Sequence, residues 1–295
     1  MKGKITKSQW ITIILWVVML FSGYQILHNL FEEEETQSYY DSLQEFVSTP
    51  AKNEEPTLQP PSTSKQPWTW LFGRANAEAF TPSPESTPPL PIAETAPILV
   101  NFDALLALNS EVTAWLYCQD TKVNYPVLHA DDNKKYLYHR LNGDYNKAGS
   151  LFVDYRNVRD FSDWNTIIYG HNMRDGSMFA TLKHYGKQDF YDFHPIWYLL
   201  TPTTSYQVDL IAGYHTTPRA QTYTIPLDVE ERDALIRLAK EKSTFVSNVE
   251  VGEKDRLVTL STCWRTFQGS RYVLLGVLRP IAEQENDYMN GLFFR

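Results

Sequence analysis

The stretches RLVTLSTC, residues 256–263, and RYVLLGVLR, residues 271–279, are two aliphatic and β-branched runs joined by a short connection that contains Gly269. Such runs favour β-strands, and the short connection favours their antiparallel pairing as a hairpin. Cys263 then faces Arg271 across the ladder, with Cβ atoms roughly 5 Å apart. A neighbouring cation lowers the pKa of a thiol from about 8.5 and favours the nucleophilic thiolate. The hairpin therefore predicts a reactive cysteine, and the guanidinium could also stabilise an oxyanion.

Six more segments have the same strand character and are bounded by turn residues. They are Thr113–Cys118, Val123–Leu128, Ser150–Asp154, Thr166–Tyr169, Ile196–Leu200 and Ser205–Tyr214. Together with the hairpin they predict a mostly β domain over residues 98–282, built as a largely antiparallel barrel or sandwich.

Three peripheral helices are expected around these strands, at residues 102–108, 179–185 and 229–242. The last is the clearest, because Asp228 can cap it and Glu231 stands at the capping-box position. It interrupts the strand series just before the cysteine strand, where it could form a wall of a substrate groove.

Residues 10–31 form a long apolar stretch, and about 20 such residues suffice for a helix to cross a bilayer. Three lysines precede the stretch and four glutamates follow it, which predicts a single-pass anchor with residues 1–9 in the cytoplasm. A cleaved signal peptide is the alternative. Its apolar core would be only about 7–15 residues long and would end in a small-x-small site, which this stretch lacks.

Residues 32–97 contain eleven acidic and three basic residues, and eleven of the seventeen prolines in the chain. A segment of this composition cannot bury a core, so we expect a disordered, self-repelling stalk outside the cell. The stalk accounts for the acidic balance of the chain, and no basic surface is implied, so nucleic acid is not an expected partner. Trp68–Phe72 is an apolar exception that either contacts the membrane or the folded domain, or has no function. Residues 283–295 form a C-terminal tail.

A cysteine nucleophile needs a base or an imidazolium partner, and six histidines lie outside the anchor. His171 is the best placed, because it directly follows Asn165–Gly170, a run that resembles a buried strand ending in glycine. The sequence does not identify a residue that orients His171, although Asn172 and Asp175 are close in the chain.

Only two cysteines occur, Cys118 and Cys263, so the chain is not a disulfide scaffold. Cys118 is expected as a small buried thiol, with a bridge to Cys263 as the alternative. Arg265 lies two residues after Cys263 and competes with Arg271 as the cation nearest the thiol. We predict neither a metal nor a cofactor.

The residues around the predicted cysteine and histidine resemble those of class B sortases, membrane-anchored cysteine transpeptidases of Gram-positive bacteria. The resemblance spans about residues 98–281. It rests on Thr259–Cys263 with Arg271, on Tyr169–Met173, on Asn124–Val127 and on Ala148–Arg156. The helix at 229–242 resembles the one that class B members carry between the sixth and seventh barrel strands, and it favours class B over class A.

The resemblance implies an eight-stranded sortase-type β-barrel and a two-step acyl transfer. Cys263 would attack the threonine carbonyl of a C-terminal sorting signal on a secreted protein and form a thioacyl enzyme. His171 would act as the general acid and base, and Arg271 would hold the oxyanion or the substrate backbone. Ser261 and Thr262 are weaker candidates for substrate binding, since strand alternation points Thr262 away from Cys263.

The acceptor amine would come from a cell-wall peptide precursor or, in a pilin-polymerising variant, from a pilin lysine. A cysteine peptidase that releases the product to water is a second reading, because water can replace the amine at the thioacyl stage. A non-catalytic surface binding module is the least favoured alternative.

Overall fold

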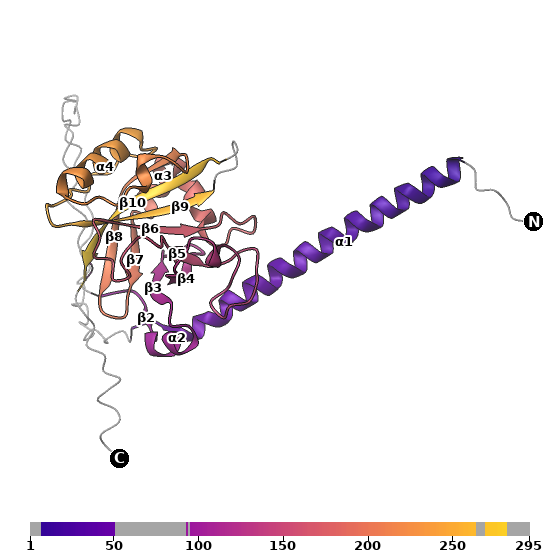
Figure 1. The fold of residues 1–295 in the computed structure, drawn as a ribbon, viewed down its shortest axis with the longest axis horizontal. Helices are drawn as coiled ribbons and strands as arrows, with labels where there is room; N and C mark the ends of the chain where they lie inside the picture. The colour runs from indigo at the N-terminus through magenta and orange to yellow at the C-terminus, as the bar shows by residue number, and fades with distance from the viewer. Residues whose placement is uncertain (1–6, 51–92, 94, 264–268, 282–295) are drawn as a thin grey trace, which may run out of the picture.

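The computed structural model describes residues 7–50, 93, 95–263 and 269–281. Eight strands close into a barrel in the order β10-β8-β7-β3-β4-β5-β6-β9 (Figure 1). Their bounds are β3 Val112–Tyr117, β4 Asn124–Leu128, β5 Leu151–Val153, β6 Asn165–Gly170, β7 Ile196–Leu200, β8 Ser205–Thr216, β9 Arg256–Cys263 and β10 Arg271–Pro280. Each of the eight predicted strands is present within two residues of its expected ends, which confirms the predicted barrel.

The ladder is mostly antiparallel, with two exceptions that matter for the site. Strand β4 pairs with β5 in parallel, and β6 pairs with β9 in parallel. Strands β9 and β10 form the predicted hairpin. Strand β9 therefore has β6 on one side and β10 on the other.

The two faces of β9 are buried differently. Val258 and Leu260 belong to the core inside the barrel, together with fully buried residues from β3, β4 and β7. Leu257 belongs to a second cluster that includes Leu235 and Ala239 of helix α4, Val229–Lys242. Because successive side chains of a strand point to opposite faces, one face of β9 packs inside the barrel and the other lies under α4.

The three predicted peripheral helices are present as α2 Phe102–Leu108, the 3₁₀ helix η3 Phe179–Gly186 and α4 Val229–Lys242. Helix α3 Gln188–Phe193 and the short 3₁₀ turns η2 Lys135–Leu137 and η4 Gln221–Tyr223 were not predicted. The predicted cap of α4 is present, since Asp228 Oδ1 accepts a 2.9 Å bond from the Glu231 amide. Glu231 in turn accepts a 3.0 Å bond from the Leu227 amide.

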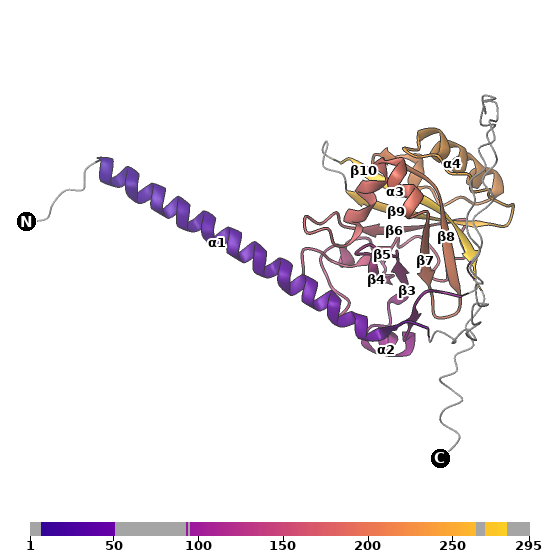
Figure 2. The same ribbon diagram turned by 180° about the vertical axis from the view of Figure 1, so that it is seen from behind.

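Helix α1 spans Lys7–Ser42 and projects from the barrel as one long helix (Figures 1 and 2). None of its most apolar window is buried, and the mean hydropathy of that window is 1.9, so the helix is long and apolar enough to span a membrane. A 3₁₀ turn η1, Leu43–Phe46, follows, and then β1, Val47–Ser48, pairs with β2, Leu99–Val100. The two ends of the proline-rich segment are thus joined at one point.

The structure differs here from the expected stalk, which was predicted to begin at residue 32. Residues 32–42 continue the helix, and Thr36, Tyr40 and Leu43 are almost fully buried against the barrel. Glutamate is a good helix former, and extending a formed helix avoids the cost of nucleation. Thr36, Tyr40 and Leu43 recur at helical spacing and give this acidic stretch one buried face. The predicted role of Trp68–Phe72 falls outside the described residues.

We predict that Leu260→Ala lowers the free energy of unfolding by about 2–5 kcal/mol, because it leaves a cavity inside the barrel where Leu260 is fully buried. Leu227→Ala is the matched control, since Leu227 is 85% exposed and should change stability by less than about 0.5 kcal/mol. Urea unfolding of the detergent-solubilised chain measures both. Equal stability losses for the two variants would contradict the assigned barrel interior.

Candidate active site

Three strand ends that carry the predicted residues meet at one rim of the barrel. The parallel ladder of β6 and β9 ends with Gly170 opposite Thr262, and His171 directly follows Gly170. The antiparallel ladder of β9 and β10 places Cys263 opposite Arg271, as the hairpin predicts. The backbone therefore brings His171, Cys263 and Arg271 to the same end of three neighbouring strands.

A backbone carbonyl holds the His171 ring. Nε2 of His171 lies 2.8 Å from the carbonyl oxygen of Leu137, at the end of η2. A carbonyl oxygen can only accept a hydrogen bond, so Nε2 carries the hydrogen and Nδ1 is the nitrogen that gains or loses a proton. The Tyr138 ring lies against the imidazole, with 5.9 Å between centroids. These contacts answer what orients His171, which the sequence leaves open.

Asp175, which is close to His171 in the sequence, does not orient the histidine ring, because its carboxylate is bonded to Ser177. Its Oδ1 accepts bonds from the Ser177 amide at 3.0 Å and the Ser177 hydroxyl at 2.7 Å. The backbone of His171 is held separately, since its carbonyl accepts a 2.8 Å bond from the Phe179 amide. The segment from His171 to Phe179 therefore folds back on itself, and its own hydrogen bonds hold it next to the end of β6.

Thr262 has a structural contact with the histidine strand. Its hydroxyl donates a 2.8 Å hydrogen bond to the carbonyl oxygen of Gly170, and the side chain is 1% exposed. Gly170 has no room for a side chain, because an added Cβ would lie 2.7 Å from the Phe179 ring. Thr262 thus links β9 to Gly170, the residue before His171. As expected from strand alternation, Thr262 lies on the face of β9 opposite that of Cys263.

Arg271 is half-buried, and its Nη1 donates a long 3.3 Å bond to the carbonyl of Ser270. Within the described part of the chain, no carboxylate forms an ion pair with it. A guanidinium without a protein carboxylate keeps its forked donors available for a carbonyl oxygen or an oxyanion. In the described part of the chain, Arg271 therefore does not form the surface ion pair that would explain it as a purely structural residue.

The structure describes the side chain of only one of the two cysteines, Cys118. Cys118 is a free, buried thiol, so the alternative of a bridge to Cys263 is excluded. Burial raises the pKa of the Cys118 thiol to about 12, which keeps it protonated and unreactive. The side chain of Cys263 and the whole of Arg265 lie outside the described residues, so the competition between Arg265 and Arg271 stays a prediction.

Two stacked tyrosines connect Ser261 to a buried carboxylate. Ser261 is 1% exposed, and its hydroxyl lies 2.8 Å from the Tyr223 hydroxyl of η4. The Tyr223 ring stacks on Tyr169 of β6, with 6.1 Å between centroids, and the Tyr169 hydroxyl donates a 2.9 Å bond to Asp154. The Ser261 hydroxyl, a weak candidate for substrate binding, is therefore already engaged by the protein.

Arg156 completes this network. Its guanidinium forms a bidentate pair with Asp154 at 2.9 and 2.8 Å and also donates to the carbonyl oxygen of Tyr223 at 3.2 Å. Burial alone would raise the pKa of Asp154, but hydrogen bonds from Arg156 and Tyr169 outweigh it and lower that pKa. Burial and the Asp154 charge raise the pKa of Tyr169, which stays a hydrogen-bond donor.

Comparison with known proteins shows the family to which the chain belongs. The family model described as the sortase domain matches residues 116–279. The chain belongs to the sortase family. It is 41% identical over 179 residues to Sortase B of Listeria monocytogenes, covering 59% of this chain and 72% of that protein. It is 26% identical over 254 residues to Sortase B of Staphylococcus aureus, covering 86% of this chain and 88% of that protein.

A solved S. aureus sortase B–substrate complex has the same fold, with a TM-score of 0.58 at 31% identity, over 61% of this chain and 85% of that one. These relatives place the chain with the class B enzymes, as the sequence resemblance predicts. The chain is thus a sortase of the cysteine transpeptidase type. Among the described residues, no three His, Cys, Asp or Glu side chains gather as a metal site would require.

Sequence reasoning missed several residues of this sortase site. The sequence analysis assigned no role to Asp154, Arg156 or Tyr223. Asp154 and Arg156 nevertheless lie two residues apart, directly after a strand. That spacing after a strand is compatible with a bidentate pair in a tight turn and could have suggested one. The Leu137 carbonyl gives no side-chain signal, because any residue type supplies the same oxygen.

We predict that Asp154→Asn lowers the free energy of unfolding at pH 7 by about 1.5–3 kcal/mol, because it replaces a buried charge-assisted pair. The folded-state pKa of Asp154 is lowered, so the carboxylate stabilises the fold above its unfolded pKa near 3.9. This contribution is lost as the pH falls through the folded pKa.

Urea unfolding at pH 7 and near pH 3 measures the difference, which should shrink at the lower pH. Asp131→Asn is the control, because Asp131 is exposed and should change stability little at either pH. A deficit for Asp154→Asn that stays constant with pH would contradict the ionised pair.

Proposed function

We propose that this sortase cleaves a C-terminal sorting signal after threonine and transfers the acyl group to an amine of the cell-wall precursor. The observation that carries the proposal is the register of β9, which has Thr262 opposite Gly170 and Cys263 opposite Arg271. The S. aureus neighbour was solved as a complex with its substrate, which supports substrate binding by this fold.

In the first step, the Cys263 sulfur attacks the threonine carbonyl carbon and the carbonyl oxygen becomes an oxyanion. Arg271 donates to that oxyanion, since its guanidinium has no carboxylate partner in the described part of the chain. The C–N bond then breaks, and protonated Nδ1 of His171 gives its proton to the leaving amine. The product is a thioester on Cys263.

In the second step, the acceptor amine attacks the thioester carbonyl and loses a proton to Nδ1 of His171. The C–S bond breaks and Cys263 returns as the thiolate. Nε2 keeps its bond to the Leu137 carbonyl throughout, because that nitrogen carries a hydrogen in both protonation states. The two steps use the same three groups, and His171 donates a proton in the first step and accepts one in the second.

Strand alternation gives Ser261 and Thr262 different roles in this scheme. Cys263 shares its face of β9 with Ser261 and the Tyr223–Tyr169 stack, so this stack forms a wall of the proposed peptide groove. Thr262 acts from the other face by holding Gly170. A pilin lysine as acceptor, and hydrolysis of the thioester by water, are the remaining alternatives.

We predict that Cys263→Ala abolishes transfer of a labelled sorting-signal peptide to an amine. His171→Ala should lower kcat by about 10²–10⁴-fold and Arg271→Ala by about 10²–10³-fold, through loss of proton transfer and of oxyanion stabilisation. Chromatography of the peptide products at varied amine concentration measures these rates and separates transfer from hydrolysis.

The chain supplies a matched control for each catalytic variant. Cys118→Ala, His184→Ala and Arg237→Ala remove the same kinds of side chain outside strands β6, β9 and β10 and should keep wild-type rates. Full activity in Cys263→Ala would disprove the acyl-transfer mechanism. Product formation that is independent of the amine would favour the peptidase.

We also propose that residues 10–31 anchor the sortase in the cell membrane with residues 1–9 in the cytoplasm. The support is the exposed apolar length of α1 and the lysines before it. Protease added to intact Gram-positive cells that express the chain should degrade the barrel and spare an N-terminal tag. A barrel protected until the cells are lysed would contradict this orientation.

A further inference from the structure

One loop, Tyr136–Gly149, touches both helix α1 and the His171 ring; we name it the bridging loop. On the site side, its Leu137 carbonyl accepts the bond from His171 Nε2 at 2.8 Å. On the other side, it contacts the last turns of α1, Glu32–Ser42. We propose that these turns of α1 are a positioning element for His171 that acts through the bridging loop. The inference rests on the proposed role of His171 as general acid and base.

The contacts between α1 and the bridging loop are polar, and they are distributed along three helical turns. They are Lys147–Glu32 at 2.6 Å, Arg140–Glu35 at 3.0 Å, Asn146–Thr36 at 2.9 Å, the Asn142 amide to the Tyr39 hydroxyl at 3.2 Å, and the Tyr40 hydroxyl to the Gly149 carbonyl. The loop is thus held from its middle to its end.

The buried contacts carry more of the docking energy than the exposed ion pairs. Lys147 and Glu32 are both substantially exposed, and such a pair contributes little in water. The Arg140 side chain, by contrast, is only 6% exposed, and its guanidinium lies 4.7 Å from the Tyr39 ring centroid. Without α1, Arg140 would lose its acidic partner and the ring that covers it.

The path from α1 to the histidine is short. The Tyr40 hydroxyl donates to the carbonyl of Gly149, which has a φ of +58°. The Gly149 backbone packs so closely on the loop that an added Cβ would lie 2.6 Å from the Leu137 carbonyl oxygen. That oxygen is the acceptor for His171 Nε2. A shift of Gly149 therefore moves the group that orients the catalytic ring.

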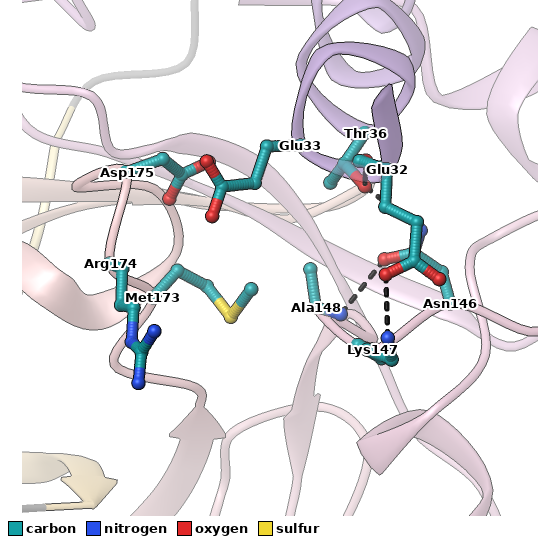
Figure 3. Close-up of a pocket in the computed structure, with 9 residues that line it drawn as sticks. All are labelled: Glu32, Glu33, Thr36, Asn146, Lys147, Ala148, Met173, Arg174 and Asp175. Carbon is teal, nitrogen blue, oxygen red and sulfur yellow. Dashed lines mark hydrogen bonds and ion pairs between the residues drawn. The ribbon is translucent and has the colours of Figure 1, made fainter. Parts of the chain in front are cut away.

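The other segment next to α1 does not provide this support. A cavity of about 230 Å³ lies between Glu33 of α1, Asn146 of the bridging loop and Met173–Asp175 after His171 (Figure 3). The close-up shows hydrogen bonds and ion pairs on the side of Asn146 and Lys147, while Arg174 points away from α1. The direct polar contacts of α1 on this side of the cavity are therefore those with the bridging loop.

The test compares Tyr40→Phe and Thr36→Val in the full-length chain, reconstituted in phospholipid nanodiscs. Each removes one hydroxyl that holds the bridging loop and keeps the size of the side chain. We expect kcat for transfer to fall roughly tenfold with the KM for the sorting-signal peptide nearly unchanged, because a misplaced acid–base group slows the chemical steps. Ring ¹⁵N shifts of His171 should show loss of the single Nε2–H tautomer.

Two controls match these variants. Tyr117→Phe removes a tyrosine hydroxyl on β3, and Gln37→Ala removes a side chain that donates a 2.7 Å hydrogen bond to Asp41 within α1 itself. Both should keep wild-type kcat and wild-type His171 ring shifts. A lowered unfolding midpoint in Tyr40→Phe and Thr36→Val, with wild-type kcat and ring shifts, would overturn the proposal and leave α1 a purely stabilising role. Should the wild-type chain transfer to no amine, the proposed function fails, while the ring shifts still decide whether α1 positions His171.

Discussion

The pairing of β9 with β6 on one side and β10 on the other is the constraint on which the site depends. Cys263 and Arg271 meet through the local hairpin, but His171 reaches them only through the parallel ladder of β6 with β9. The Thr262 hydroxyl adds a side-chain bond to Gly170 at the end of this ladder. The ladder of β6 with β9 is therefore needed both to close the barrel and to align the three strand ends.

The predictable part of the fold was local. Aliphatic and β-branched runs bounded by turn residues located all eight strands, and the short connection between β9 and β10 set the register of Cys263 with Arg271. The neighbour of β9 across the parallel ladder is about ninety residues earlier in the chain, and no local pattern encodes that pairing. The three residues could be grouped beforehand only through the resemblance to class B sortases.

Two features escaped sequence reasoning for physical reasons. The orienting group of His171 is a backbone carbonyl, so its position depends on the path of the chain and not on a residue type. Residues 32–42 have the composition of a solvated stalk, because their exposed faces are rich in glutamate. The two buried side chains in this stretch, Thr36 and Tyr40, cannot be recognised as buried from the sequence, because the surface that covers them is formed by distant parts of the chain.

The short ladder of β1 with β2 changes what the proline-rich segment does for the molecule. Val47 pairs with Val100 and Ser48 with Leu99, so the chain leaves the barrel and returns to it at one place. Because this ladder already joins the two ends of the segment, the length of the segment does not set the distance between α1 and the barrel. That distance is set instead by α1 itself, whose Thr36 and Tyr40 are buried against the barrel.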